Sequence, residues 1–285
     1  MNIASKWMII LRAYSWPASL TPMIIGGVVA YKSGRFNAPD FALTLIAGLF
    51  LHSAANLANT YYDHKNGVDK KGADDIGILE ELISPGNAIR LVFVLFSLSA
   101  AAGVYLAVKN DLAPLIAVGA AGFALAWFYT ANLAYKYSAL GEIGIFLCFG
   151  PLIVAGTALI QTGRILPDAV IASIPTGLLI TGIVFANNMR DLKTDAETRI
   201  RTLPQILGEK RSLFFYYFLI AAPYIVTVFF LGAVPSLLIL LLSVPPALQL
   251  YKMAGKGDFS RLVRETAKFV GIFGLLFSSA IYFRK

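Results

Sequence analysis

The sequence predicts an all-α integral membrane protein, and three observations lead to this fold class. Hydrophobic residues fill 58% of the 285 positions and charged residues only 14%. The mean hydropathy of +0.71 lies far above that of an ordinary soluble domain. Nine apolar runs have about the 20 residues that a helix needs to cross the hydrocarbon layer.

The nine runs are bounded by charged residues, glycine or proline, which set the limits of each expected transmembrane helix. They are too long and too continuously apolar for the alternating strands of a β-barrel. We therefore expect a single transmembrane domain over residues 1–285. The expected spans lie near 13–31, 41–61, 89–108, 112–131, 140–161, 167–187, 213–232, 235–251 and 267–283.

Composition excludes several classes of protein. So apolar a chain is neither disordered nor, as a whole, a nucleic-acid-binding protein. Its single cysteine, Cys148, excludes an intramolecular disulfide and a cysteine-based metal cluster. The first apolar run is too long for a signal peptide and lacks a small-residue cleavage pattern, so we expect a mature amino terminus. No protein partner is evident from the sequence.

The basic residues set the expected orientation. The chain has 24 basic and 16 acidic residues, a net charge of +8, and most basic residues fall in the amino terminus and in alternate loops. Because Lys and Arg concentrate on the cytoplasmic side, we expect a multi-pass protein of the cell membrane with its amino terminus inside and its carboxyl terminus outside. Among the acidic residues, only Asp40, Asp111 and Asp168 fall on the outer side, so we expect a cytoplasmic active site.

Polar residues line one face of the second expected span where it reaches the cytoplasm. Asn56, Asn59 and Asp63 are spaced at i, i+3 and i+7, so they share one side of a helix. Asp69 follows Gly67, where the chain can fold back, so the loop sets its position. Polar side chains in membrane-embedded turns are costly and usually functional.

The end of the sixth expected span repeats this pattern. Asn187, Asp191 and Asp195 are spaced at i, i+4 and i+8, again on one face. The Asn-x-x-x-Asp step recurs four spans later, hence on the same side of the membrane, which indicates an internal repeat. We expect two four-helix pseudo-repeats whose clusters face one another across a central cavity, and a ninth helix. The halves are about 1–137 and 138–266, and the ninth helix is 267–285.

Together the two clusters indicate a magnesium and diphosphate site. One Asp at a helix end is usually only solvated, but two matched sets favour a site. Carboxylate and amide oxygens without Cys or His favour Mg²⁺, which leaves room for substrate phosphates, and we expect two ions. Lys136 and Arg190 are the expected diphosphate contacts. Further candidates for the diphosphate are Asn56, Asn188, Lys65 and Lys70.

Three segments resemble the UbiA superfamily of intramembrane aromatic prenyltransferases. They are NLANTYYDHKNGVDKKGADD at 56–75, YTANLAYKYSALGE at 129–142 followed by FGP at 149–151, and NNMRDLKTDAETRIRTLPQILG at 187–208. Their order and their position on one face make the similarity specific. The chain looks most like the branch that prenylates naphthoquinone precursors, which includes bacterial 1,4-dihydroxy-2-naphthoate prenyltransferases and the animal vitamin K₂ enzyme. Bacterial members commonly have Asp where this chain has Thr60, so one potential ligand is absent.

The resemblance implies a UbiA-like helical bundle and assigns roles to matching positions. It implies magnesium ligands at Asn59, Asp63, Asp191 and Asp195. It also implies diphosphate contacts at Lys136 and Arg190, and it places further site residues at Asp69, Tyr129, Asn187 and Asn188.

The expected reaction moves a polyprenyl group from an allylic isoprenyl diphosphate to an aromatic acceptor, here 1,4-dihydroxy-2-naphthoate or a related naphthoquinol in menaquinone synthesis. The allylic C–O bond ionises to a delocalised carbocation, which the electron-rich ring attacks. We expect Asp69, Tyr129 and Asn187 to be catalytic. Asp69 is the candidate proton acceptor, and the ring of Tyr129, unless it only packs, is a candidate to stabilise the cation.

Two rival functions and one ambiguous residue stay open at this point. A transporter is also a repeated bundle with embedded polar residues, although here these gather at one mouth. A second alternative is prenyl transfer to another lipid acceptor, such as an archaeal ether lipid. His52 lies inside the second expected span, where it is either catalytic or a hydrogen-bonded packing residue.

Overall fold

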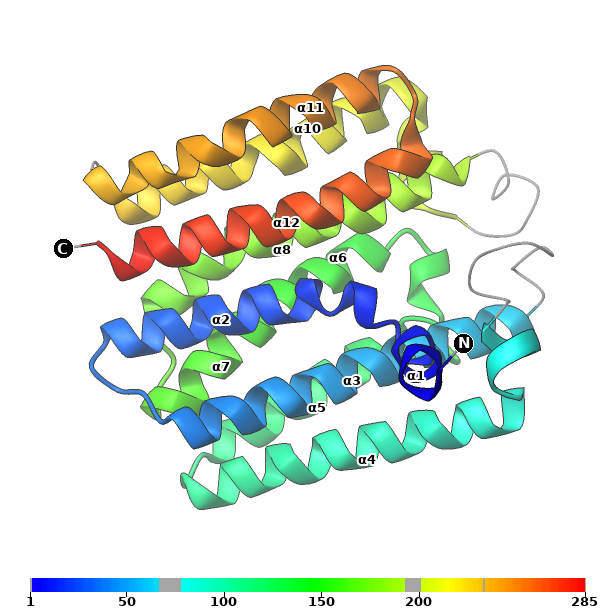
Figure 1. The fold of residues 1–285 in the computed structure, drawn as a ribbon, viewed down its shortest axis with the longest axis horizontal. Helices are drawn as coiled ribbons and strands as arrows, with labels where there is room; N and C mark the ends of the chain where they lie inside the picture. Colours follow the sequence, from blue (N-terminus) through cyan, green and yellow to red (C-terminus); the bar gives the residue numbers. More distant parts are fainter. Residues whose placement is uncertain (1, 67–77, 193–200, 233, 285) are drawn as a thin grey trace.

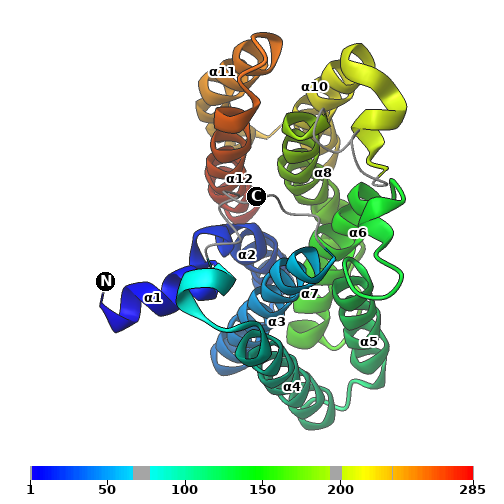
Figure 2. The same ribbon diagram turned by 90° about the vertical axis from the view of Figure 1, so that its right-hand side faces the viewer.

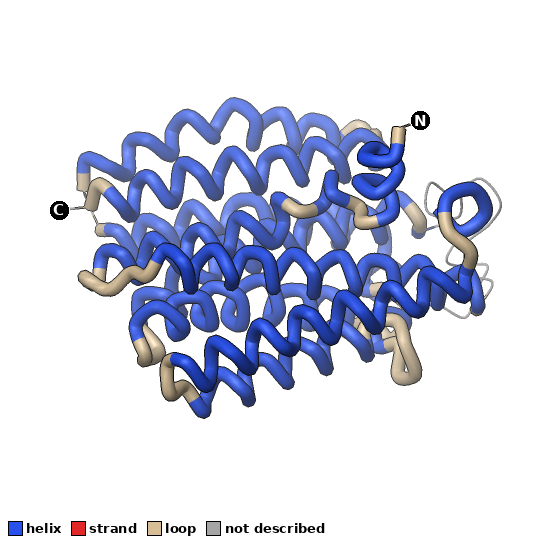
Figure 3. Tube along the Cα trace, turned by 60° about the horizontal axis from the view of Figure 1, so that its bottom comes forward, coloured by secondary structure: helices blue, strands red, loops and turns tan. Residues whose placement is uncertain are grey.

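The computed structural model describes residues 2–66, 78–192, 201–232 and 234–284. This part of the chain contains helices and loops and no strand (Figure 3). The long helices run along a common axis, whereas α1 is seen end-on and crosses that axis (Figure 1). The all-α prediction is therefore confirmed.

The helical segments follow one another with short connections, as expected for a bundle. They are α1 (Ile3–Ile10), η1 (Ala13–Ser15), α2 (Pro17–Lys32), α3 (Ala38–Lys65), η2 (Ile78–Leu82), α4 (Pro85–Lys109), α5 (Ala113–Phe128), η3 (Tyr135–Tyr137), α6 (Gly141–Leu147), η4 (Cys148–Leu152), α7 (Ile153–Thr162), α8 (Pro167–Arg190), α10 (Leu203–Leu231), η5 (Pro235–Ser243), α11 (Val244–Gly255) and α12 (Phe259–Tyr282).

Local sequence explains where the helices begin and end. The side chain of Asn37 accepts a hydrogen bond of 3.0 Å from the backbone N–H of Asp40, which caps the start of α3. Proline occupies the first turn of most long helices, where its missing N–H has no intrahelical partner to lose. Gly163 ends α7 with φ of 76°, a conformation that glycine adopts without steric cost.

Six helical stretches among the described residues are long and apolar enough to cross a bilayer. They are Ala38–Lys65, Pro85–Lys109, Gly141–Thr162, Pro167–Arg190, Leu203–Leu231 and Pro235–Gly255. Helices α2 and α5 have only 16 residues each, and α12 carries charged residues in its first turns. The expected nine spans are therefore not confirmed, although a multi-pass membrane protein is. The division into two pseudo-repeats stays a prediction.

The first expected span differs from the helix found. The chain breaks at Arg12, whose φ of 50° lies in the left-handed region, so α1 and α2 are separate helices. Figure 2 shows α1 projecting sideways from the bundle. A second irregularity is η4, a π-turn around Pro151 that joins α6 to α7. Because proline lacks the N–H that a regular α-helix needs, it widens the turn there.

The bundle has an apolar interior and an apolar exterior. Phe269, Phe273 and Phe277 on α12 are at most 1% exposed and pack toward α8 and α10. Phe229 on α10 is 85% exposed, as a side chain that faces lipid would be. In Figure 1, the start of α1 and the ends of α3 and α8 lie toward one end of the bundle, and α12 ends at the other.

Close packing of α2 against α7 depends on Gly26. A Cβ at this position would lie 2.5 Å from the carbonyl oxygen of Val154 and 2.9 Å from the Cβ of Thr157. Since the first neighbour is backbone, the helices would have to separate. We predict that Gly26→Ala costs about 1–3 kcal/mol and lowers the Tm in detergent. Gly119→Ala is the control, because nothing lies within 4 Å of that Cβ, and an equal loss of Tm there would contradict the packing argument.

Candidate active site

The carboxylate of Asp63 is the centre of a partly buried polar group at the end of α3, called here the α3 cluster. Its members are Asn59, Asp63, Thr130, Lys136 and Tyr137. The Nζ of Lys136 lies 2.7 Å from both carboxylate oxygens of Asp63 and 2.6 Å from the Oδ1 of Asn59. The hydroxyl of Tyr137 also donates to Asp63. Asn59 donates to Asp63 over 3.0 Å and accepts from the Thr130 hydroxyl over 2.8 Å.

Three oxygens from two side chains thus converge on one cation. The side chains of Lys136 and Asp63 are only 13% and 9% exposed, so their attraction is weakly screened by water. The ammonium also lies 4.7 Å from the Tyr137 ring centre and 5.7 Å from that of Tyr129. The α3 cluster is therefore a binding place for positive charge.

A second group, called here the α8 cluster, consists of Asn187, Arg190 and Asp191 at the end of α8. Asn187 donates to Asp191 Oδ2 over 3.2 Å, as Asn59 does to Asp63. The guanidinium of Arg190 donates from Nε to Oδ1 and from Nη2 to Oδ2 of Asp191, both at 2.7 Å. These side chains are more open than the α3 cluster, with 39% of Arg190 and 32% of Asp191 exposed. The matched Asn-to-Asp bonds follow from the matched i, i+4 spacing.

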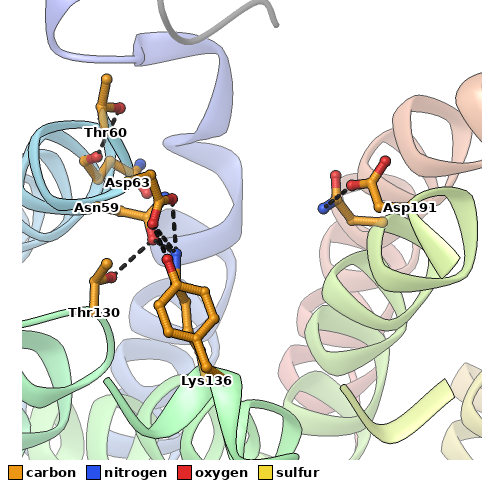
Figure 4. A network of polar contacts seen from close by, with 9 residues as sticks. Asn59, Thr60, Asp63, Thr130, Lys136 and Asp191 are labelled. Atoms are coloured by element: carbon orange, nitrogen blue, oxygen red, sulfur yellow. Dashed lines mark hydrogen bonds and ion pairs between the residues drawn. The ribbon is translucent and has the colours of Figure 1, made fainter. Parts of the chain in front are cut away.

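The two clusters lie on facing elements. Figure 4 shows Asp191 on one side and Asn59, Asp63 and Lys136 on the other. Backbone hydrogen bonds bring the two parts of the chain together at this end: Ala139 N–H donates to Arg201 over 2.8 Å, and Arg201 N–H donates to Tyr137 over 3.0 Å. The loop that carries Lys136 is thereby fixed to the segment that precedes α10.

Glu142 is a site neighbour that sequence reasoning missed. It is 3% exposed in the first turn of α6, and its Oε1 accepts 2.9 Å from the side chain of Asn188 on α8. Its Oε2 has no partner among the described residues. The signal was available, because Glu142 ends the YTANLAYKYSALGE segment.

The remaining expected site residues fall into two groups. Asn56 donates a hydrogen bond of 2.9 Å to Ser15, at the end of η1 and just before α2. Lys65 is exposed at the end of α3, with its Nζ 5.9 Å from the centre of the Tyr62 ring. Asp69, Lys70 and Asp195 lie outside the described residues. Within the described ranges, no group of three or more His, Cys, Asp or Glu side chains is placed to hold a metal.

The ion pair between Lys136 and Asp63 predicts an effect on stability that can be measured. Lys136→Met leaves the Asp63 carboxylate buried without its cation, and we predict a loss of about 3 kcal/mol or more, seen as a lower Tm in EDTA. The double variant Lys136→Met with Asp63→Asn removes that charge and should recover most of the loss. Independent, additive effects of the two substitutions would show that the pair is not coupled.

Comparisons with known proteins agree with the fold. Residues 19–280 match the model of the UbiA prenyltransferase family. The chain is 33% identical over 279 residues to UbiA prenyltransferase domain-containing protein 1 of Mus musculus, covering 96% of this chain and 82% of the relative.

Two solved structures show the same fold. A UbiA homolog from Aeropyrum pernix K1 has a TM-score of 0.72 at 18% identity, covering 94% of this chain and 97% of the homolog. A UbiA homolog from Archaeoglobus fulgidus, bound to DMAPP and Mg²⁺, has a TM-score of 0.65 at 16% identity, covering 96% and 99%. The resemblance seen in the three sequence segments is confirmed at the level of the family. The chain belongs to the UbiA prenyltransferase family and is a prenyltransferase.

Proposed function

We propose that this prenyltransferase moves a polyprenyl group from an allylic isoprenyl diphosphate to an aromatic acceptor, with Mg²⁺ and on the cytoplasmic side of the cell membrane. The observation that carries the proposal is the cation held by three oxygens of Asn59 and Asp63, opposite a second Asn and Asp pair on α8. A phosphate group between two such clusters can be bound only through cations, since bare carboxylates repel it.

The donor set fits magnesium. The α3 cluster presents carboxylate and amide oxygens to a cation already, in the form of the Lys136 ammonium. Hard oxygen donors suit Mg²⁺, and few protein ligands leave positions for phosphate oxygens. We assign Asn59 and Asp63 to one ion, and Asp191 with Asp195 to a second. When bound, Mg²⁺ neutralises the negative charge that develops on the departing diphosphate.

Lys136 and Arg190 have a second role in this proposal. Each now pairs with the carboxylate of its own cluster, Lys136 with Asp63 and Arg190 with Asp191. With divalent ions held by those carboxylates, Lys136 and Arg190 can turn toward the space between the clusters and contact a diphosphate there. The bidentate fork of Arg190 and the point charge of Lys136 then bind phosphate oxygens. Asn56, Asn188, Lys65 and Lys70 are secondary diphosphate contacts.

The chain's own side chains control the later steps. Asn187 holds the carboxylate of Asp191 in place through its amide. The Tyr129 ring presents an aromatic face that stabilises the allylic carbocation. An apolar bundle keeps water away from the allylic carbocation. Asp69 accepts the proton that the acceptor ring loses after attack.

The acceptor proposed is 1,4-dihydroxy-2-naphthoate or a related naphthoquinol, as in menaquinone synthesis. It is supported by the resemblance of the NTYYD, YKYSALGE and NNMRD segments to the naphthoquinone branch. The donor is supported by the solved UbiA homologs from Archaeoglobus fulgidus that are bound to DMAPP or GPP with Mg²⁺. An apolar lipid-facing bundle suits a polyprenyl tail, which enters from the bilayer without a soluble carrier.

The metal assignment predicts that Asp63→Asn and Asp191→Asn each lower kcat at least a hundredfold, because each removes a charged ligand while keeping its shape. Asp168→Asn is the matched control, since Asp168 lies exposed in the first turn of α8, at the other end of that helix. Turnover is followed as Mg²⁺-dependent release of diphosphate. Wild-type turnover in the Asp63 or Asp191 variant would contradict the assignment.

The acceptor is tested by incubating purified protein with labelled geranylgeranyl diphosphate, Mg²⁺ and 1,4-dihydroxy-2-naphthoate. We expect a prenylated naphthoquinol, identified by mass spectrometry. Diphosphate release with prenylation of a glycerol-phosphate lipid instead would replace the acceptor and keep the metal site. Flux of a solute into proteoliposomes, without diphosphate release, would favour a transporter.

A further inference from the structure

A chain of polar side chains continues from the α3 cluster into the bundle. His52, Asn56, Asn59 and Asp63 are spaced at i, i+4, i+7 and i+11, so they share one face of α3. The eleven-residue separation places His52 about 16 Å below Asp63 at 1.5 Å per residue. An imidazole at that depth needs polar partners, because the surrounding helices are apolar.

His52 has a partner at each ring nitrogen. Nε2 lies 2.7 Å from the hydroxyl of Ser15, and Nδ1 lies 2.7 Å from the hydroxyl of Ser19. The ring edge also meets Phe149 of the π-turn η4, with ring centres 5.7 Å apart. Ser15 is in the bend before α2, and Ser19 is in the first turns of α2, so His52 joins α3 to both.

Counting protons fixes the tautomer of His52. Ser15 has one hydroxyl proton, and it is donated to the carbonyl oxygen of Arg12 over 2.7 Å. Toward His52 the Ser15 hydroxyl therefore accepts, so the imidazole carries its proton on Nε2. Nδ1 then has a lone pair and accepts from the hydroxyl of Ser19. Both nitrogens are in use, so His52 has neither a free lone pair nor a free N–H for a proton-transfer step.

The Ser15 side of His52 continues by hydrogen bonds toward the active-site end of α3. Besides His52, the Ser15 hydroxyl accepts a 2.9 Å bond from the amide of Asn56, one turn below Asn59. It also holds the carbonyl of Arg12, the residue with left-handed backbone at which α1 and α2 separate. Arg12 is buried and interacts electrostatically with His52. The Ser19 side reaches only the interior of α2.

We propose that His52 is a positioning residue that acts through its Nε2–H bond to Ser15. Together with the bond from Asn56, this bond fixes Ser15, and with it the bend at Arg12, against α3. It thereby sets the wall of the diphosphate site next to Asn59. The indole of Trp16 supports the same junction by donating to the Ser53 hydroxyl over 3.0 Å. The bond from Ser19 to Nδ1 follows from this tautomer and does not reach the site.

Two isosteres separate the two sides of His52. His52→Gln places an amide N–H where Nε2 lies and keeps the bond to Ser15. His52→Asn places an amide oxygen where Nδ1 lies and keeps the bond from Ser19. We expect His52→Gln and Ser19→Ala to bind the diphosphate like wild type. His52→Asn and Ser15→Ala should each lose about tenfold in affinity, the size of effect expected for one misplaced polar contact.

The readout is the Kd for geranylgeranyl thiolodiphosphate, an unreactive donor analogue, with Mg²⁺ and no acceptor, so the result does not depend on the acceptor proposed above. The inference rests on the proposed diphosphate site, and saturable Mg²⁺-dependent binding by wild type tests that site separately. In turnover assays, His52→Asn and Ser15→Ala should each raise the KM for the prenyl donor about tenfold, with a smaller change in kcat. The Tm of each variant shows that it is folded.

Equal loss of affinity in His52→Gln and His52→Asn would overturn the inference, since the two keep opposite bonds. So would a pH–rate profile for His52→Gln that lacks an ionisation present in wild type, because that result would make His52 an acid or base. Wild-type affinity in Ser15→Ala would likewise contradict it. An unchanged pH profile, with the two isosteres differing as stated, supports it.

Discussion

The carboxylate of Asp63 needs a cation, and most of the described site follows from that need. A charge removed from water in an apolar bundle is costly unless it is paired and hydrogen-bonded. Lys136 supplies the charge, and Asn59 and Tyr137 supply hydrogen bonds. Lys136 comes from the loop after α5, so satisfying Asp63 also fixes that loop over the end of α3. The same oxygens that bind an ammonium are those that a divalent ion prefers, and the proposed function has Mg²⁺ take the place of the ammonium there.

The fold holds the two helix ends that the proposed function requires opposite each other (Figure 4). Helices α3 and α8 each end in an Asn and Asp pair. The backbone bonds between 137–139 and Arg201 join the turn that carries Lys136 to the segment before α10. Gly26 lets α2 pack closely against α7. The hydrogen bond between Ser15 and His52 holds the bend before α2 against α3. The site is therefore rigid on the α3 side and more open on the α8 side, where Arg190 and Asp191 are about one-third exposed.

Much of this was predictable, because the bilayer imposes strong rules on sequence. Apolar length gave the helices, and i, i+4 spacing gave the Asn59–Asp63 and Asn187–Asp191 pairs, since both depend only on local geometry. The break at Arg12 was not predictable, because it depends on bonds from Ser15 to α3 that are distant in sequence. The nine expected spans are not confirmed, since α2 and α5 are short and α12 carries charged residues in its first turns. Glu142 was overlooked, because its burial depends on Asn188 of a helix far along the chain.

The most direct test of the account is the position of divalent ions in a crystal or cryo-electron microscopy structure with Mn²⁺ and geranylgeranyl thiolodiphosphate. The account predicts metal density at the oxygens of Asn59 and Asp63 and at Asp191, bridged by the diphosphate, with the Nζ of Lys136 moved from Asp63 to a phosphate oxygen. Metal and diphosphate bound elsewhere, with Lys136 still paired to Asp63, would contradict it.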